Sequence, residues 1–60
     1  MTTYEKGQFV SIDTDNAEWG RVCGKGYIEG RVQGGYLVNA LSIRADIVVK
    51  EEDIAEVLTP

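Results

Sequence analysis

A short glycine-containing pattern occurs twice in succession in the middle of the sequence. Residues 20–27 read GRVCGKGY, and residues 30–36 read GRVQGGY. In each copy a β-branched valine precedes glycines, and the chain then continues with tyrosine, a residue that strands favour. This pattern predicts short antiparallel strands joined by glycine turns, and it constrains the fold class more than any other feature.

The other segments extend this prediction to five or six short strands. Apolar and polar residues alternate over residues 7–13, which predicts a strand with one buried face. Further strands are expected at residues 18–23, 27–33, 36–41 and 47–50. The acidic end, residues 51–58, fits either a short helix or a 3-10 turn at 51–53 followed by a closing strand. We favour the second, because eight residues make a marginal helix.

The first expected turn, at residues 24–26, joins two of these strands as a hairpin. Its register places Trp19 opposite Arg31 and Arg21 opposite Glu29. Such cross-strand neighbours would form a cation–π pair and an ion pair on one face of the sheet.

The second expected turn is Gly34-Gly35, with positive φ at both residues, as tight two-residue hairpins require. Its register places Val32 opposite Leu37, and Gly30 in mid-strand predicts a bulge or a sharp bend. A shift of one residue would exchange the two faces, so we expect a well-specified register. The expected core consists of Val10, Ile12, Val22, Ile28, Val32, Leu37, Leu41, Ile47, Val49 and Val57.

Short strands with central glycines favour a closed barrel, because closure removes exposed sheet edges. Five segments fit such a fold: KGQFVSI at 6–12, GRV at 20–22 and 30–32, YLV at 36–38, and EDIAEV at 52–57. Through these segments the chain resembles the bacterial SH3-like barrels over nearly its whole length. The expected fold is therefore all-β, a small SH3-like barrel formed by residues 1–60 as a single domain. The ALYDY pattern of SH3 domains that bind proline-rich peptides does not occur.

The composition argues against catalysis and metal binding. The chain has no histidine and a single cysteine, so Cys23 would lack a histidine base and a structural zinc site would lack ligands. Asp13 and Asp15 are possible ligands for a hard cation, but the longer ligand series of a calcium loop is missing. We expect no enzymatic activity, no cofactor and no metal.

Cellular location and association are inferred from the same sequence features. Apolar runs are only a few residues long, and residues 1–6 lack the basic and apolar stretches of a signal peptide. A lone cysteine suits a reducing compartment. We expect a cytoplasmic protein without a membrane segment, either a monomer or a weak homo-oligomer.

Charge is distributed unevenly along the chain, whose net charge is −4. Residues 1–18 hold four acidic residues and one lysine, and residues 45–60 hold five acidic residues and one lysine. Residues 19–44 hold four basic residues and one glutamate. Affinity for nucleic acid comes from neutralising phosphates with Lys and Arg, so we expect nucleic-acid binding to be weak or absent.

Two surfaces are candidates for binding another protein. The first is an aromatic and basic face, because Trp, Tyr and Arg are enriched at interface hot spots; it comprises Trp19, Arg21, Tyr27, Arg31 and Tyr36. The second is an acidic patch that could dock on a basic partner; it comprises Glu51, Glu52, Asp53 and Glu56.

Three functions follow from these surfaces. The first choice is a small non-catalytic protein–protein interaction module, as an accessory subunit or adaptor. The alternative is an acidic inhibitor, of the type found in phages and mobile elements, that occupies a nucleic-acid-binding site on its partner. The third is a weak nucleic-acid-binding barrel that stacks bases on aromatic side chains.

Overall fold

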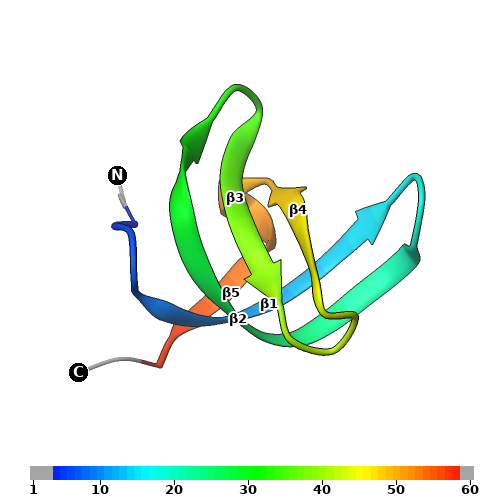
Figure 1. Ribbon diagram of the computed structural model, residues 1–60, viewed down its shortest axis with the longest axis horizontal. Helices are drawn as coiled ribbons and strands as arrows, with labels where there is room; N and C mark the ends of the chain where they lie inside the picture. Colours follow the sequence, from blue (N-terminus) through cyan, green and yellow to red (C-terminus); the bar gives the residue numbers. More distant parts are fainter. Residues whose placement is uncertain (1–3, 59–60) are drawn as a thin grey trace.

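The computed structural model describes residues 4–58, and over this range the fold is all-β (Figure 1). The elements are β1 (Phe9–Asn16), β2 (Gly20–Val32), β3 (Gly35–Ala40), β4 (Ala45–Val49), the 3-10 turn η1 (Glu51–Asp53) and β5 (Ile54–Val57). The predicted all-β class, the antiparallel pairing and the 3-10 turn at residues 51–53 are confirmed, whereas the strands expected at residues 18–23 and 27–33 form the single strand β2. The single-domain prediction also covers residues 1–3 and 59–60, which lie outside the described part.

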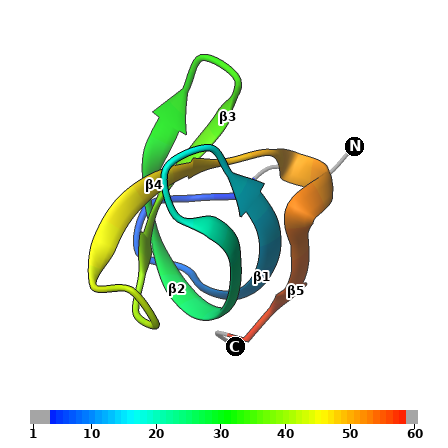
Figure 2. The same cartoon turned by 90° about the vertical axis from the view of Figure 1, so that its right-hand side faces the viewer.

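Within residues 4–58 the strands form one open antiparallel sheet in the order β4-β3-β2-β1-β5. The first half of β2 pairs with β1 and its second half pairs with β3. Figures 1 and 2 show how the sheet curves through this long shared strand. The sequence predicts closure into a barrel, whereas β4 and β5 remain the two edges of the sheet.

The prediction of a hairpin turn at residues 24–26 is wrong. Those residues lie inside β2, and the first hairpin instead turns at residues 17–19, between β1 and β2. Arg21 therefore lies opposite Asp15, and Arg31 lies opposite Tyr36. The expected cation–π pair of Trp19 with Arg31 and the ion pair of Arg21 with Glu29 do not follow from this register.

The second hairpin forms near its expected place but turns one residue earlier. Val32 pairs with Gly35, so the turn residues are Gln33 and Gly34. Gly34 and Gly35 have φ of 92° and 150°, so the prediction of positive φ at both residues is confirmed. Because side chains alternate along a strand, the shift of one residue reverses the faces of β3.

This reversal changes which side chains of β3 are buried. Tyr36, Val38 and Ala40 point into the core, where the sequence predicts Leu37 and Leu41. The buried apolar residues are Val10, Ile12, Val22, Ile28, Tyr36, Val38, Ala40, Ile47, Val49 and Ile54. Of the other expected core members, Val32 is half-buried and Val57 is exposed.

Two glycines of β2 explain its long path through the sheet. The register with β3 shifts between Ile28 and Gly30, which confirms the bulge predicted at Gly30. At Gly26, a Cβ atom would lie 2.6 Å from the backbone oxygen of Asn39, so only glycine allows this approach of β3. The sequence suggested a turn at Gly26, whereas the structure uses it for close strand packing.

Candidate protein-binding surface

The β1–β2 hairpin projects from the body of the fold, and its turn carries Trp19 (Figure 1). The side-chain oxygen Oδ1 of Asn16 accepts hydrogen bonds from the backbone N–H groups of Glu18 (2.8 Å) and Trp19 (3.0 Å). Gly20 follows with φ of 76°, a conformation that favours glycine. The backbone around Trp19 is thus held in place, while its side chain is 48% exposed.

Arg21 lies on β2 just beyond this turn and forms a bidentate ion pair with Asp13 of β1. The Nε and Nη2 atoms of Arg21 lie 3.1 and 3.0 Å from the two carboxylate oxygens of Asp13. The hydrogen bond and the charge of Arg21 lower the pKa of Asp13, and the same hydrogen bond raises the pKa of Arg21. Both side chains are exposed, so solvent screening limits the contribution of the pair to stability.

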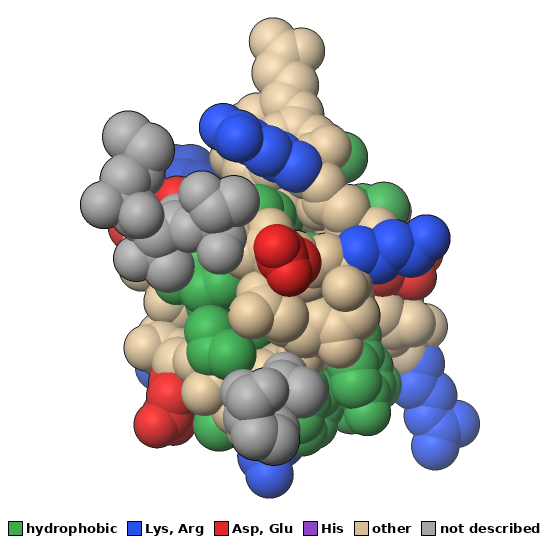
Figure 3. Space-filling view, turned by 90° about the vertical axis from the view of Figure 1, so that its left-hand side faces the viewer, with side chains coloured by type: hydrophobic (Ala, Val, Ile, Leu, Met, Phe, Trp, Pro, Cys, Tyr) green, Lys and Arg blue, Asp and Glu red, His purple; other side chains and the backbone are tan. Residues whose placement is uncertain are grey.

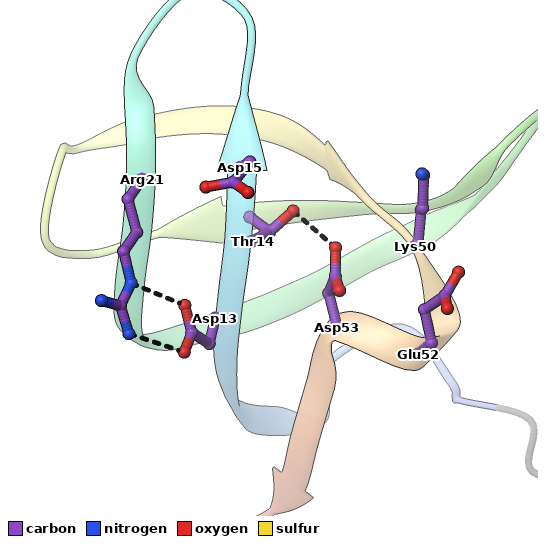
Figure 4. Close-up of a pocket in the computed structure, with 7 residues that line it drawn as sticks. All are labelled: Asp13, Thr14, Asp15, Arg21, Lys50, Glu52 and Asp53. Carbon is purple, nitrogen blue, oxygen red and sulfur yellow. Dashed lines mark hydrogen bonds and ion pairs between the residues drawn. The ribbon is translucent and has the colours of Figure 1, made fainter.

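A depression of about 570 Å³ lies between β1 and η1 (Figure 4). Its lining residues are Asp13, Thr14, Asp15, Arg21, Lys50, Glu52 and Asp53. The Oγ1 atom of Thr14 donates a hydrogen bond of 2.8 Å to Oδ2 of Asp53, which ties β1 to η1. Four carboxylates and two cationic side chains share this space, so the depression is acidic.

The predicted acidic patch is divided by the structure. Glu51, Glu52 and Glu56 are exposed, whereas Asp53 is half-buried and accepts the hydrogen bond from Thr14. Glu56 lies on β5 opposite Ser11.

Asp13 and Asp15 belong to an acidic surface that the sequence did not predict. They are almost forty residues from η1 in the sequence, and the fold brings them beside Glu52. One sequence feature could have predicted their position. Asp13 and Asp15 alternate with the inward-facing Ile12 and Thr14 in β1, which places both aspartates on the outer face of the sheet.

The structure also divides the predicted aromatic and basic face. Tyr27 is 45% exposed and packs against Phe9, with ring centroids 4.7 Å apart. Arg31 is exposed near the β2–β3 turn, away from Trp19 in the strand register. Figure 3 shows one side of the molecule, where hydrophobic side chains reach the surface between polar and charged ones.

Tyr36 does not belong to an exposed face. Its side chain is only 3% exposed, and its hydroxyl oxygen accepts a hydrogen bond of 3.3 Å from the backbone N–H of Tyr4. The two rings meet edge to face, with centroids 5.3 Å apart. The one-residue shift of β3 explains this correction, because it turns Tyr36 from the outer face to the core.

No protein-family model, curated protein or solved structure matches this chain. Between residues 4 and 58 the structure has no helix with the length and apolar character needed to span a membrane. Over the same residues, no cluster of three or more acidic or cysteine side chains is arranged to hold a metal ion. The candidate site is therefore defined by the geometry of the β1–β2 hairpin and the acidic depression.

Proposed function

We propose that this protein is a small, non-catalytic, cytoplasmic protein–protein interaction module that uses Trp19 as its anchor. The carrying observation is the exposed Trp19 side chain on a turn fixed by Asn16. Tryptophan is among the residues most enriched at binding hot spots. A backbone that is already ordered loses less conformational entropy on binding, which favours affinity.

The charges near Trp19 indicate the chemistry of the partner. Glu18 precedes Trp19, and Asp15 lies in the second strand pair from the turn, opposite Arg21. The acidic depression continues this negative surface toward η1. A complementary partner offers an apolar pocket for the indole ring, bordered by Lys and Arg side chains.

Capture from an extract of the source organism tests the proposal. The bait is the wild-type protein, with Trp19→Ala as the test variant and Leu41→Ala as the control. Leu41 is similarly exposed, at 44%, but lies after β3, away from the turn at residues 17–19. A specific partner should be retained by wild type and by Leu41→Ala and lost with Trp19→Ala. Equal retention by both variants would contradict the proposal.

The acidic inhibitor is the second candidate function, and the depression between β1 and η1 favours it. Carboxylates of Asp13, Asp15 and Glu52 could take the places of phosphates on a basic partner. In that case, the captured partner is a nucleic-acid-binding protein, and this protein displaces nucleic acid from that partner. The double variant Asp15→Asn with Glu52→Gln should then displace less nucleic acid, while a simple adaptor would leave nucleic-acid binding unaffected.

The SH3-like assignment also remains a proposal, supported by the strand order, the long shared β2 and the 3-10 turn before β5. Nucleic-acid binding by this chain itself has less support. Its aromatic and basic candidates are spread over different parts of the sheet, and ten acidic residues oppose six basic ones.

A further inference from the structure

The two edges of the sheet differ in how well they are protected against pairing with another chain. Natural edge strands are commonly very short, or are interrupted by a bulge or a proline. β5 has four residues and a register shift against β1. β4 has five residues, pairs with β3 without a shift, and carries Val48 with 48% exposure. β4 is therefore the edge more open to a further strand.

The hydrogen-bond pattern shows which groups β4 offers. The backbone N–H of Leu41 donates to the carbonyl oxygen of Lys25, so odd-numbered residues of β3 face β2. Even-numbered residues of β3 then face β4, where they pair with residues 45, 47 and 49. The N–H and C=O groups of Asp46 and Val48 consequently point toward the free edge.

We infer that β4 pairs with β4 of a second copy of this chain, antiparallel, with Val48 opposite Val48 of that copy. In this register Asp46 lies opposite Lys50 of the second copy, and symmetry forms the same pair twice. The two exposed valines would cover one another, next to the half-buried Leu37 of β3. The sequence of β4 is therefore complementary to itself in both charge and hydrophobicity.

The neighbouring register, centred on Ile47, is less favourable. It would place Asp46 opposite Val48 of the second copy, so the aspartate would have no cationic neighbour across the contact.

Carboxylates next to β4 provide a second reason for a cation at this edge. Glu29 is close enough to Asp46 for their carboxyl groups to interact, and its Oε1 atom is shielded from solvent without a hydrogen-bond partner among residues 4–58. Lys50 of the second copy would approach this pair of acids when it binds Asp46. Lys6 already acts on Glu29, and a further cation beside Asp46 would offset more of the repulsion between the two carboxylates.

The dimer is expected to be weak, because a single short strand buries less than the roughly 1,200 Å² of a stable interface. Sedimentation equilibrium at protein concentrations up to about 1 mM can detect the weak dimerisation expected from such an interface. Wild type should associate reversibly into dimers, without larger species. A wild-type protein that stays monomeric over the whole range would overturn the inference.

Charge reversal tests the register. Asp46→Lys and Lys50→Asp each place like charges opposite one another, and each should weaken dimerisation at least about tenfold. An equimolar mixture of the two variants should form a heterodimer, because the new lysine of one chain then faces the new aspartate of the other. Restored association in the mixture would also show that both variants are folded. Glu56→Lys, which changes the charge of the exposed β5 strand, is the control and should dimerise like wild type.

Two results would contradict the inference. One is a pair of single variants that associate as strongly as wild type, and the other is a mixture that associates no better than each variant alone. Either would show that β4 does not form the contact in this register. The proposed role of Trp19 would be unaffected, because Trp19 lies in the β1–β2 turn and not on β4.

Discussion

At the scale of single residues, one glycine decides how closely the β2–β3 turn approaches the end of β4. Gly35 has φ of 150°, and a Cβ atom there would collide with the backbone carbonyl of Val49. Gly30 also lies in β2 next to the bulge, but a Cβ there would meet open space. The two positions form a matched pair, because the same substitution meets a backbone at one and solvent at the other.

We therefore expect Gly35→Ala to lower the free energy of unfolding by about 1–3 kcal/mol, the usual cost of inserting an atom into a packed site. Gly30→Ala should be neutral or slightly stabilising, because it restricts the unfolded chain without a clash. Urea denaturation of both variants measures the difference. A Gly35→Ala protein as stable as Gly30→Ala would show that the turn does not hold the observed register.

Glu29 is a residue whose ionisation should oppose folding. Side-chain hydrogen bonding with the Asp46 carboxyl group favours protonated Glu29 and raises its pKa; desolvation and the charge of Asp46 act in the same direction, and the charge of Lys6 acts against them. Folded protein therefore binds this proton more readily than unfolded chain does. The resulting stability is present at acidic pH and is lost as the pH rises through the raised pKa of Glu29.

Glu29→Gln should remove the loss of stability that ionisation of Glu29 causes. The melting temperature of this variant should therefore exceed that of wild type by a margin that grows from acidic to neutral pH. Glu56→Gln, on the exposed face of β5, is the control for removing one negative charge. Thermal melts across the acidic to neutral range make the comparison. A margin for Glu29→Gln that is independent of pH, or equal to that of the control, would refute the interaction with Asp46.

At the scale of elements, η1 is held against β1 by the hydrogen bond from Thr14 to Asp53. Thr14 is buried, so removal of its hydroxyl leaves the Asp53 carboxylate without this donor. Thr14→Val, which keeps the shape of the side chain, should cost about 1–3 kcal/mol of unfolding free energy. Thr14→Ser keeps the hydroxyl and should retain more of the stability. Chemical denaturation distinguishes them, and equal losses in both variants would show that the hydrogen bond is unimportant.

Hydrophobic alternation was sufficient to predict the strand class and most of the core of β1, β2 and β4. It failed at β3, because an error of one residue in the turn at Gln33-Gly34 exchanges its two faces. It also failed at residues 24–26, where a glycine needed for close packing resembles a turn glycine. Both failures have the same physical origin: what requires glycine at these positions is a contact with a strand distant in sequence.

At the scale of the whole molecule, the curvature of the sheet creates the candidate surface. The expected strand register placed Trp19 on an exposed face, although the hairpin assumed for it was wrong, and the sequence contains no local signal that joins Asp13 and Asp15 to Glu52. That proximity depends on the order of the strands, in which β5 returns to pair with β1 and carries η1 with it. The placement of Tyr36 in the core likewise depends on the register of β3.

The central claim, that Trp19 anchors a partner protein, is tested most directly by observing that side chain during binding. Trp19 is the single tryptophan of the chain, so incorporation of 5-fluorotryptophan gives one fluorine NMR signal from this protein. Titration with the captured partner should shift this signal and remove its sensitivity to the exchange of water for deuterium oxide, because the indole ring becomes buried. A signal that remains unchanged and solvent-sensitive when the partner is saturating would contradict the claim.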